Sequence, residues 1–108
     1  MEHYSTFSTD KLRPSLGHVS CMLLGAQQGC VGDCAAGISV YASREYAPAQ
    51  RHPFQEGFYV LEGEGCAQVG DSAFEISEGT CFLVPSETNH TMRASGDKPV
   101  TVFWFHSA

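Results

Sequence analysis

The sequence is poor in basic residues: six Lys and Arg stand against twelve Asp and Glu, a formal net charge of −6. Nucleic acid and anionic membranes bind cationic surfaces, so this balance argues against both as partners. No apolar run approaches the roughly 20 residues that a membrane span requires. The N-terminus, Met1-Glu2-His3-Tyr4-Ser5, has no basic start followed by an apolar stretch, and we therefore expect no signal peptide.

The sequence also lacks the cysteine patterns of the common thiol sites. Its five cysteines are Cys21, Cys30, Cys34, Cys66 and Cys81. Only Cys30 and Cys34 are close, and their spacing is not that of a Cys-x-x-Cys redox motif, so neither this motif nor an all-cysteine zinc site is indicated. An odd number of cysteines without a signal peptide indicates reduced thiols in the cytoplasm. We expect most of them to be small buried hydrophobic residues.

No stretch shows a sustained helical stripe of apolar residues. Instead, short apolar segments rich in β-branched and aromatic residues alternate with turns that contain many of the 11 glycines. Such strands, repeated every ~8–12 residues, predict an antiparallel all-β sandwich or barrel. A length of 108 residues fits one domain. We expect residues 1–15 to form an arm or edge strand and residues 16–108 the barrel. The predicted strands are 19–24, 38–42, 58–61, 66–69, 73–76, 81–84, 90–94 and 100–105.

Four polar residues are placed to meet at one end of such a barrel. Gln50 and His52 are two apart, so on an extended chain they point to the same face. Glu56 begins the next strand, and His90 begins a later strand just past the turn at residues 85–89. Two imidazoles, a carboxylate and an amide oxygen suit a divalent transition metal. The sequence therefore predicts a metal site made of Gln50, His52, Glu56 and His90.

These two segments resemble the paired motifs of the cupin superfamily, whose members are small double-stranded β-helix (jelly-roll) barrels. The first motif is Gly-x5-His-x-His-x(3–4)-Glu-x6-Gly, and the second is Gly-x5-Pro-x-Gly-x2-His-x3-Asn. The residues that match in spacing are His52, Glu56 and Gly63 in the first, and Gly79, Pro85 and His90 in the second. The resemblance covers residues 50–90 and implies a single-domain cupin.

The sequence departs from both motifs. Gln50 replaces the first motif's leading His, and that motif's leading Gly is absent. Glu87 replaces a Gly of the second motif, and Ala94 replaces its Asn. Gln is a neutral and weaker donor than imidazole, so we expect weaker affinity for metals that prefer nitrogen.

The resemblance implies a small homodimeric metalloprotein. It implies a divalent metal ion (Fe, Mn, Zn, Ni or Co) and an enzyme of the dioxygenase, isomerase or lyase type that acts on a small polar organic substrate. Arg44 and Tyr46 share parity with Gln50, and Met92 shares the face of His90, so we predict these three as substrate-binding residues. An equally open alternative leaves Arg44 solvated on the outer face.

Two other functions stay open. One is a non-catalytic small-molecule module that binds or senses, for example, a sugar. The other is a thiol-based role for Cys66 or Cys81 near the metal. We expect His3 and His18 to be structural or exposed. His106 lies on the last strand and could line the pocket, although we favour a structural role for it.

Overall fold

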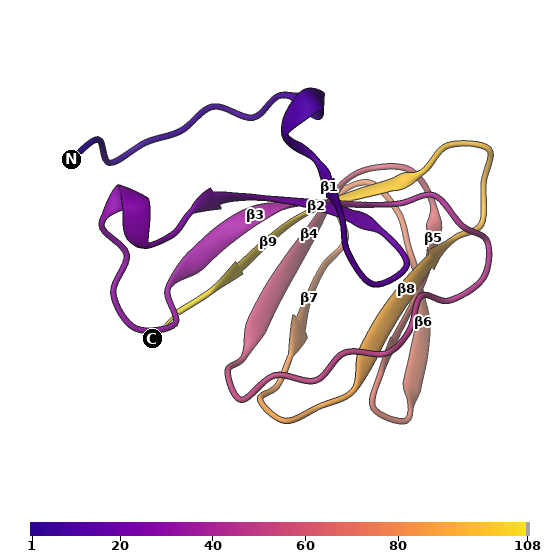
Figure 1. Ribbon diagram of the computed structural model, residues 1–108. Coiled ribbons are helices and arrows are strands. Elements are labelled where there is room, and N and C mark those ends of the chain that lie inside the picture. The colour runs from indigo at the N-terminus through magenta and orange to yellow at the C-terminus, as the bar shows by residue number, and fades with distance from the viewer. Residues whose placement is uncertain (108) are drawn as a thin grey trace.

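The computed structural model describes residues 1–107, and its strands form two antiparallel sheets (Figure 1). The larger sheet has the strand order β1-β2-β3-β9-β4-β7, and the smaller has the order β6-β5-β8. The strands are β1 (Arg13–Pro14), β2 (Val19–Leu24), β3 (Ala35–Tyr41), β4 (Glu56–Glu62), β5 (Gly65–Val69), β6 (Ser72–Ile76), β7 (Cys81–Val84), β8 (His90–Ala94) and β9 (Val100–His106). This arrangement confirms the predicted all-β jelly-roll barrel.

Helical structure is confined to two short 3-10 turns among the described residues, Thr9–Lys11 and Ala26–Gln28. No helix among them is long and apolar enough to cross a bilayer. Residues 1–8 lie outside any helix or strand and run beside β2, where the Ser5 hydroxyl donates to the Leu23 carbonyl at 2.5 Å. The first strand pairs with β2 through Arg13 and Pro14.

Two strands begin earlier than the sequence pattern predicts. β3 begins at Ala35 rather than residue 38, and β4 begins at Glu56, where we expect the next strand to begin, although its apolar pattern starts only at residue 58. Small and charged residues hide these starts, because Ala, Gly and Glu have low strand propensity. Cross-strand pairing with β9 overrides that propensity, since His106 pairs with both Ala35 and Glu56. The earlier start places Glu56 on a regular strand rather than in a loop.

The core lies between the inner faces of the two sheets. Along β4 and β9 the apolar side chains alternate, so that Phe58 and Val60 point inward beside Val100 and Val102. Met92 closes the core from β8 and is 1% exposed. Packing of this kind fixes the strand register, because a slip by one residue turns the apolar set outward.

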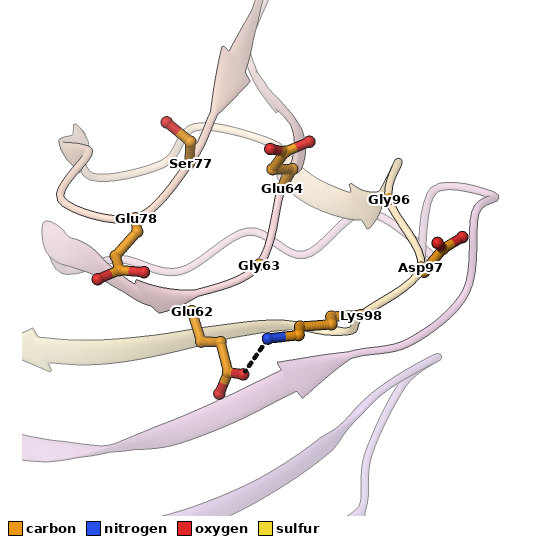
Figure 2. A pocket seen from close by; sticks show the side chains of 8 residues that line it. All are labelled: Glu62, Gly63, Glu64, Ser77, Glu78, Gly96, Asp97 and Lys98. Atoms are coloured by element: carbon orange, nitrogen blue, oxygen red, sulfur yellow. Dashed lines mark ion pairs between the residues drawn. The ribbon is translucent and has the colours of Figure 1, made fainter.

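The barrel has two different ends. At the far end of β4, the turns after β4, β6 and β8 enclose a concavity of about 480 Å³, shown in Figure 2. Its side chains are mostly acidic, and Lys98 pairs with Glu62 at 3.5 Å. The end at which β4 begins contains the histidines and is described below.

Gly37 on β3 makes room for the tryptophan of β9. Gly37 and Trp104 are cross-strand partners. A Cβ at position 37 would lie 2.3 Å from the Cys21 carbonyl oxygen and 2.4 Å from Cζ2 of Trp104. The indole ring therefore lies against the backbone of β3, which places it beside the histidine end of the barrel.

We expect Gly37→Ala to lower the free energy of unfolding by about 1–3 kcal/mol, because the methyl group overpacks the site between a backbone carbonyl and a ring. Gly96→Ala is the matched control, since a Cβ there meets no atom closer than 3.8 Å. We expect the control to change stability by less than about 0.5 kcal/mol. Urea unfolding followed by Trp104 fluorescence measures both, and equal stabilities would contradict the tight contact.

Candidate metal centre

Three potential metal ligands converge inside the histidine end of the barrel. One donor atom each from His52, Glu56 and His90 lies within 4.8 Å of the other two. His52 comes from the segment between β3 and β4, Glu56 begins β4, and His90 begins β8. The structure thus brings together residues from three elements and from both sheets.

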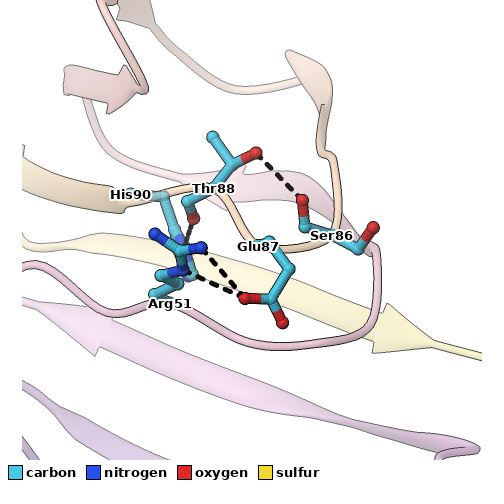
Figure 3. A network of polar contacts seen from close by, with 5 residues as sticks. All are labelled: Arg51, Ser86, Glu87, Thr88 and His90. Carbon is cyan, nitrogen blue, oxygen red and sulfur yellow. Dashed lines mark hydrogen bonds and ion pairs between the residues drawn. The ribbon is translucent and has the colours of Figure 1, made fainter.

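The His90 ring is held by its own turn. Its Nδ1 donates to the carbonyl of Thr88 at 3.2 Å, as Figure 3 shows. Its Nε2 lies 3.5 Å from Oε1 of Glu56, and both side chains are almost fully buried. A ring nitrogen that donates to a carbonyl leaves the other nitrogen free to accept, which is the tautomer a metal ligand needs.

Gln50 is joined to His90 through the backbone. The N–H of Gln50 donates to the carbonyl of His90 at 3.0 Å, and the N–H of His90 donates back at 2.9 Å. This isolated bridge adds residue 50 to the edge of the smaller sheet beside β8. The side chain of Gln50 lines the same cavity as His52 and Glu56.

A third backbone bond ties the turn at residues 85–89 to the first motif. The N–H of Glu87 donates to the carbonyl of His52 at 2.6 Å. Glu87 has a φ of 59°, the one positive φ among the non-glycine residues described. On the outside, Nε and Nη2 of Arg51 donate to Oε2 of Glu87 at 3.1 and 3.0 Å (Figure 3). Glu87 therefore keeps the left-handed conformation of the Gly that it replaces in the cupin-like motif.

The three donor groups fit a divalent transition metal. Ligand atoms about 2.1 Å from one ion lie about 3.0–3.5 Å apart in octahedral or tetrahedral geometry. The distance between His90 Nε2 and Glu56 Oε1 is already in this range, and small side-chain rotations close the rest. Two imidazoles with one carboxylate are typical of metal sites that keep positions open for substrate.

Burial and neighbouring charges set the acid–base behaviour of this end. Burial lowers the pKa of His52. The charge of Glu56 opposes this effect to a smaller extent, and His90 and His106 lower the pKa further. Burial also raises the pKa of Tyr41, and the charge of Glu56 adds to the effect. His52 is therefore favoured as a neutral imidazole, and Tyr41 as a phenol that keeps its proton.

The donors line a cavity of about 190 Å³. Its other walls come mainly from the inner face of the larger sheet. They carry hydroxyl groups and aromatic rings, namely Ser15, His18, Ser20, Ser39, Tyr41, Phe54, Phe58, Trp104 and His106.

Comparison with known proteins identifies the family. Residues 37–106 match the Cupin domain family Cupin_2. The protein is a cupin. A search of curated proteins found no match.

Solved structures share the fold of this cupin at low sequence identity. A protein from Photorhabdus luminescens superposes with a TM-score of 0.82 at 13% identity, over 96% of this chain and 86% of that one. An RmlC-like cupin from Shewanella frigidimarina superposes with a TM-score of 0.77 at 19% identity, over 100% of this chain and 93% of that one. A predicted oxalate decarboxylase from Thermotoga maritima superposes with a TM-score of 0.71 at 16% identity, over 83% of this chain and 79% of that one.

Two histidines that we expected to be structural or exposed line the cavity of this cupin. His106 stacks on Phe54 with ring centroids 3.9 Å apart, and its Nδ1 donates to the carbonyl of Asp33. His18 stacks on Tyr41 at 4.4 Å. The parity of His106 with Trp104 on the last strand is a signal that could have found it. His18 precedes β2, where no periodicity fixes its direction.

The structure does not bring the three predicted substrate-binding residues to this cavity. Arg44 points outward and pairs with Asp97 at 3.3 Å, because the chain bends before Pro48 and does not continue as one strand. Tyr46 stacks with Arg93, whose guanidinium carbon lies 5.4 Å from the centroid of the Tyr46 ring. Met92 is in the core rather than in the cavity wall.

The two cysteines considered for a thiol role also lie away from the cavity. Cys66 accepts a hydrogen bond from Arg93 at 3.4 Å, and Cys81 is exposed on β7. Both stand at strand positions whose neighbours along the chain face the core. Alternation along the strand therefore turns these two thiols outward.

We expect Glu87→Gly to be more stable than Glu87→Ala by about 1–2 kcal/mol, because only glycine adopts a positive φ without a steric cost. Both variants lose the ion pair with Arg51, so their difference isolates the backbone conformation. Thermal and urea unfolding measure the difference. An alanine variant as stable as the glycine variant would contradict the left-handed conformation at residue 87.

Proposed function

We propose that this cupin is a metal-dependent enzyme that acts on a small polar organic molecule at a divalent metal inside the barrel. The convergence of His52, Glu56 and His90 in one buried cavity carries the proposal. Gln50 is proposed as a fourth ligand, since its side chain faces the same cavity. We propose that the metal is Fe, Mn, Zn, Ni or Co.

A metal bound here would act as a Lewis acid on substrate oxygens or, if it is iron, activate dioxygen. The chain's own residues bind and orient the substrate. Tyr41 keeps its proton and presents a hydrogen-bond donor, while the hydroxyls of Ser20 and Ser39 stand on the neighbouring wall, 2.9 Å from each other. Phe54 and Trp104 form the apolar side and exclude water.

The cavity limits the substrate in size and charge. Its volume is below the roughly 300–1,000 Å³ of pockets that hold drug-sized ligands. Among the described residues, its lining contains neither Lys nor Arg, since Arg44 is paired on the outside. A carboxylate of the substrate would therefore be bound by the metal and by neutral donors. We propose a small oxygen-rich substrate that binds the metal directly.

The similar structures do not choose a reaction. The Thermotoga maritima neighbour is described as a predicted oxalate decarboxylase. Because one fold supports many reactions, the choice among dioxygenase, isomerase and lyase chemistry depends on the site.

Metal binding can be followed directly, because the sole tryptophan, Trp104, lines the cavity. Titration of the metal-free protein with Co²⁺ should quench Trp104 fluorescence and give a 1:1 stoichiometry by calorimetry. We expect His52→Ala and His90→Ala to weaken Co²⁺ binding by at least about tenfold. Gln50→His should strengthen it on the order of tenfold, because imidazole is the better donor.

His3→Ala is the control, since His3 is exposed and bonds only to the Gln28 carbonyl. It should bind Co²⁺ as tightly as the wild type. Unchanged binding in both ligand variants would refute the site, and circular dichroism separates this outcome from unfolding. Elemental analysis of protein purified without a His tag then names the resident metal.

The alternative is a non-catalytic module that binds a small molecule such as a sugar. The hydroxyl groups of Ser20 and Ser39, which line the same cavity as the aromatic ring of Trp104, favour it, since sugars combine polar edges with apolar faces. The two functions separate in a variant in which Gln50, His52, Glu56 and His90 are all alanine. Wild-type affinity of this variant for a monosaccharide, by calorimetry, supports the binding module over the enzyme.

We also propose that the chain forms a homodimer through the outer face of its larger sheet. Neighbouring positions of β4, β7 and β9 there expose Tyr59, Leu61, Leu83 and Phe105. Leu83 and Phe105 are 55% and 49% exposed, and both lie beside Gly57. A contiguous apolar face of this kind is typical of protein–protein contacts.

Light scattering after size-exclusion chromatography should show a dimer at micromolar concentration, and Leu83→Asp should convert it to a monomer, because a buried unpaired charge is costly. Leu16→Asp, at an exposed loop position away from this face, should leave the dimer intact. A wild-type monomer, or a dimer that survives Leu83→Asp, would show that this face is not the interface.

The cytoplasm is the location that we propose. All five cysteines are free thiols in the structure. Cytoplasmic reductants keep thiols in this state, whereas oxidising compartments favour disulfides.

A further inference from the structure

The loop between β2 and β3 brings two cysteine sulfurs into contact. Sγ of Cys34 donates to Sγ of Cys30 at 3.2 Å, and both residues are half-buried. The turn between them is closed by the N–H of Cys34, which donates to the carbonyl of Val31. The same contact raises the pKa of the Cys30 thiol, with smaller contributions from burial and from the charge of Cys34. The sequence spacing gave no indication of this pair.

We propose that Cys30 and Cys34 form a reversible disulfide by exchange with a low-molecular-weight disulfide. A disulfide bond is about 2.05 Å long, so the sulfurs need to approach by only about 1.2 Å from their 3.2 Å contact. Gly29 and Gly32 lie on either side of Cys30, and glycine restricts the backbone less than any other residue, which favours this movement. The other three cysteines stand on strands, and the contact between Cys30 and Cys34 is the one cysteine–cysteine hydrogen bond among the described residues.

The exchange proceeds in two steps. A thiolate of the pair attacks one sulfur of the external disulfide, forms a mixed disulfide and releases the first thiol. The second cysteine of the pair then attacks the protein sulfur of the mixed disulfide and releases the second thiol. In total, the two cysteines lose two electrons and two protons, and the external disulfide is reduced to two thiols.

The pair is linked to the cavity through the residue that precedes Cys34. The carbonyl of Asp33 accepts the hydrogen bond from Nδ1 of His106. The His106 ring stacks on Phe54 at 3.9 Å and on Trp104 at 5.6 Å. Because closing the disulfide tightens the turn at residues 31–33, it moves this carbonyl and with it His106. The redox state of the pair therefore changes the wall of the cavity.

The test uses the full chain without metal, so its result does not depend on the proposed function. A Cys21→Ser, Cys66→Ser, Cys81→Ser variant, which retains only the pair, is treated with oxidised glutathione and analysed by intact mass and peptide mapping. We expect the loss of two hydrogen atoms within the peptide that contains residues 30–34, and its reversal by dithiothreitol. A Cys30→Ser variant of the same background is the control and should instead retain one glutathionyl group. Retention of glutathionyl groups in the parent variant, or pairing between chains, would overturn the proposal.

The link to the cavity has its own readout. Oxidation of the parent variant should shift the emission of Trp104, whereas the same treatment of the Cys30→Ser control should leave it unchanged. If Cys21→Ser destabilises the fold because Cys21 is buried, the Cys66→Ser, Cys81→Ser background serves instead. A disulfide that forms without any change in Trp104 emission would overturn the link to the cavity.

Discussion

Backbone hydrogen bonds between two distant segments hold the candidate metal centre together. Gln50 and His90 exchange a pair of these bonds, and Glu87 donates a third to His52. The bonds set the distance between two imidazole-bearing segments, the loop that contains His52 and the start of β8 at His90. Without them, His52 would have no fixed position relative to His90, since no strand contains residue 52. The exposed ion pair between Arg51 and Glu87 adds little by comparison, because such pairs contribute about 0–1 kcal/mol.

The convergence of the ligands could be predicted from the sequence because it depends on few features. Parity along an extended chain predicts a shared face for Gln50 and His52, and the motif spacings place Glu56 and His90 at strand starts. The structure adds that the extended segment is not a regular strand. It meets β8 through an isolated bridge at Gln50 and through Ala47, whose N–H donates to the Met92 carbonyl at 3.3 Å. Parity is therefore a sound guide at residues 50–52, where backbone bonds hold the chain.

The same argument fails a few residues earlier. Arg44 and Tyr46 share parity with Gln50, but the chain bends at Arg44 and Glu45, so no regular strand joins these residues to the bridge. The chain turns, and Arg44 finds a partner in Asp97, more than 50 residues later in the sequence. The walls of the cavity could not be predicted for a related reason. His18 lies in the turn before β2, and Ser39 and Tyr41 lie on β3, which is buried on both faces, so alternation of apolar residues does not show which face lines the cavity. The contact between Cys30 and Cys34 likewise depends on the path of an irregular loop.

The acidic end of the barrel explains why the net charge of −6 tells little about the substrate. β4 runs from Glu56 in the candidate metal centre to Glu62 at the acidic end, six steps along the chain. At about 3.3 Å per residue, these ends lie about 20 Å apart. Physiological salt screens exposed charges beyond about 8 Å. The carboxylates of Glu64, Glu78 and Asp97 therefore act at the distant end of the barrel, whereas the carboxylate that lines the cavity is that of Glu56.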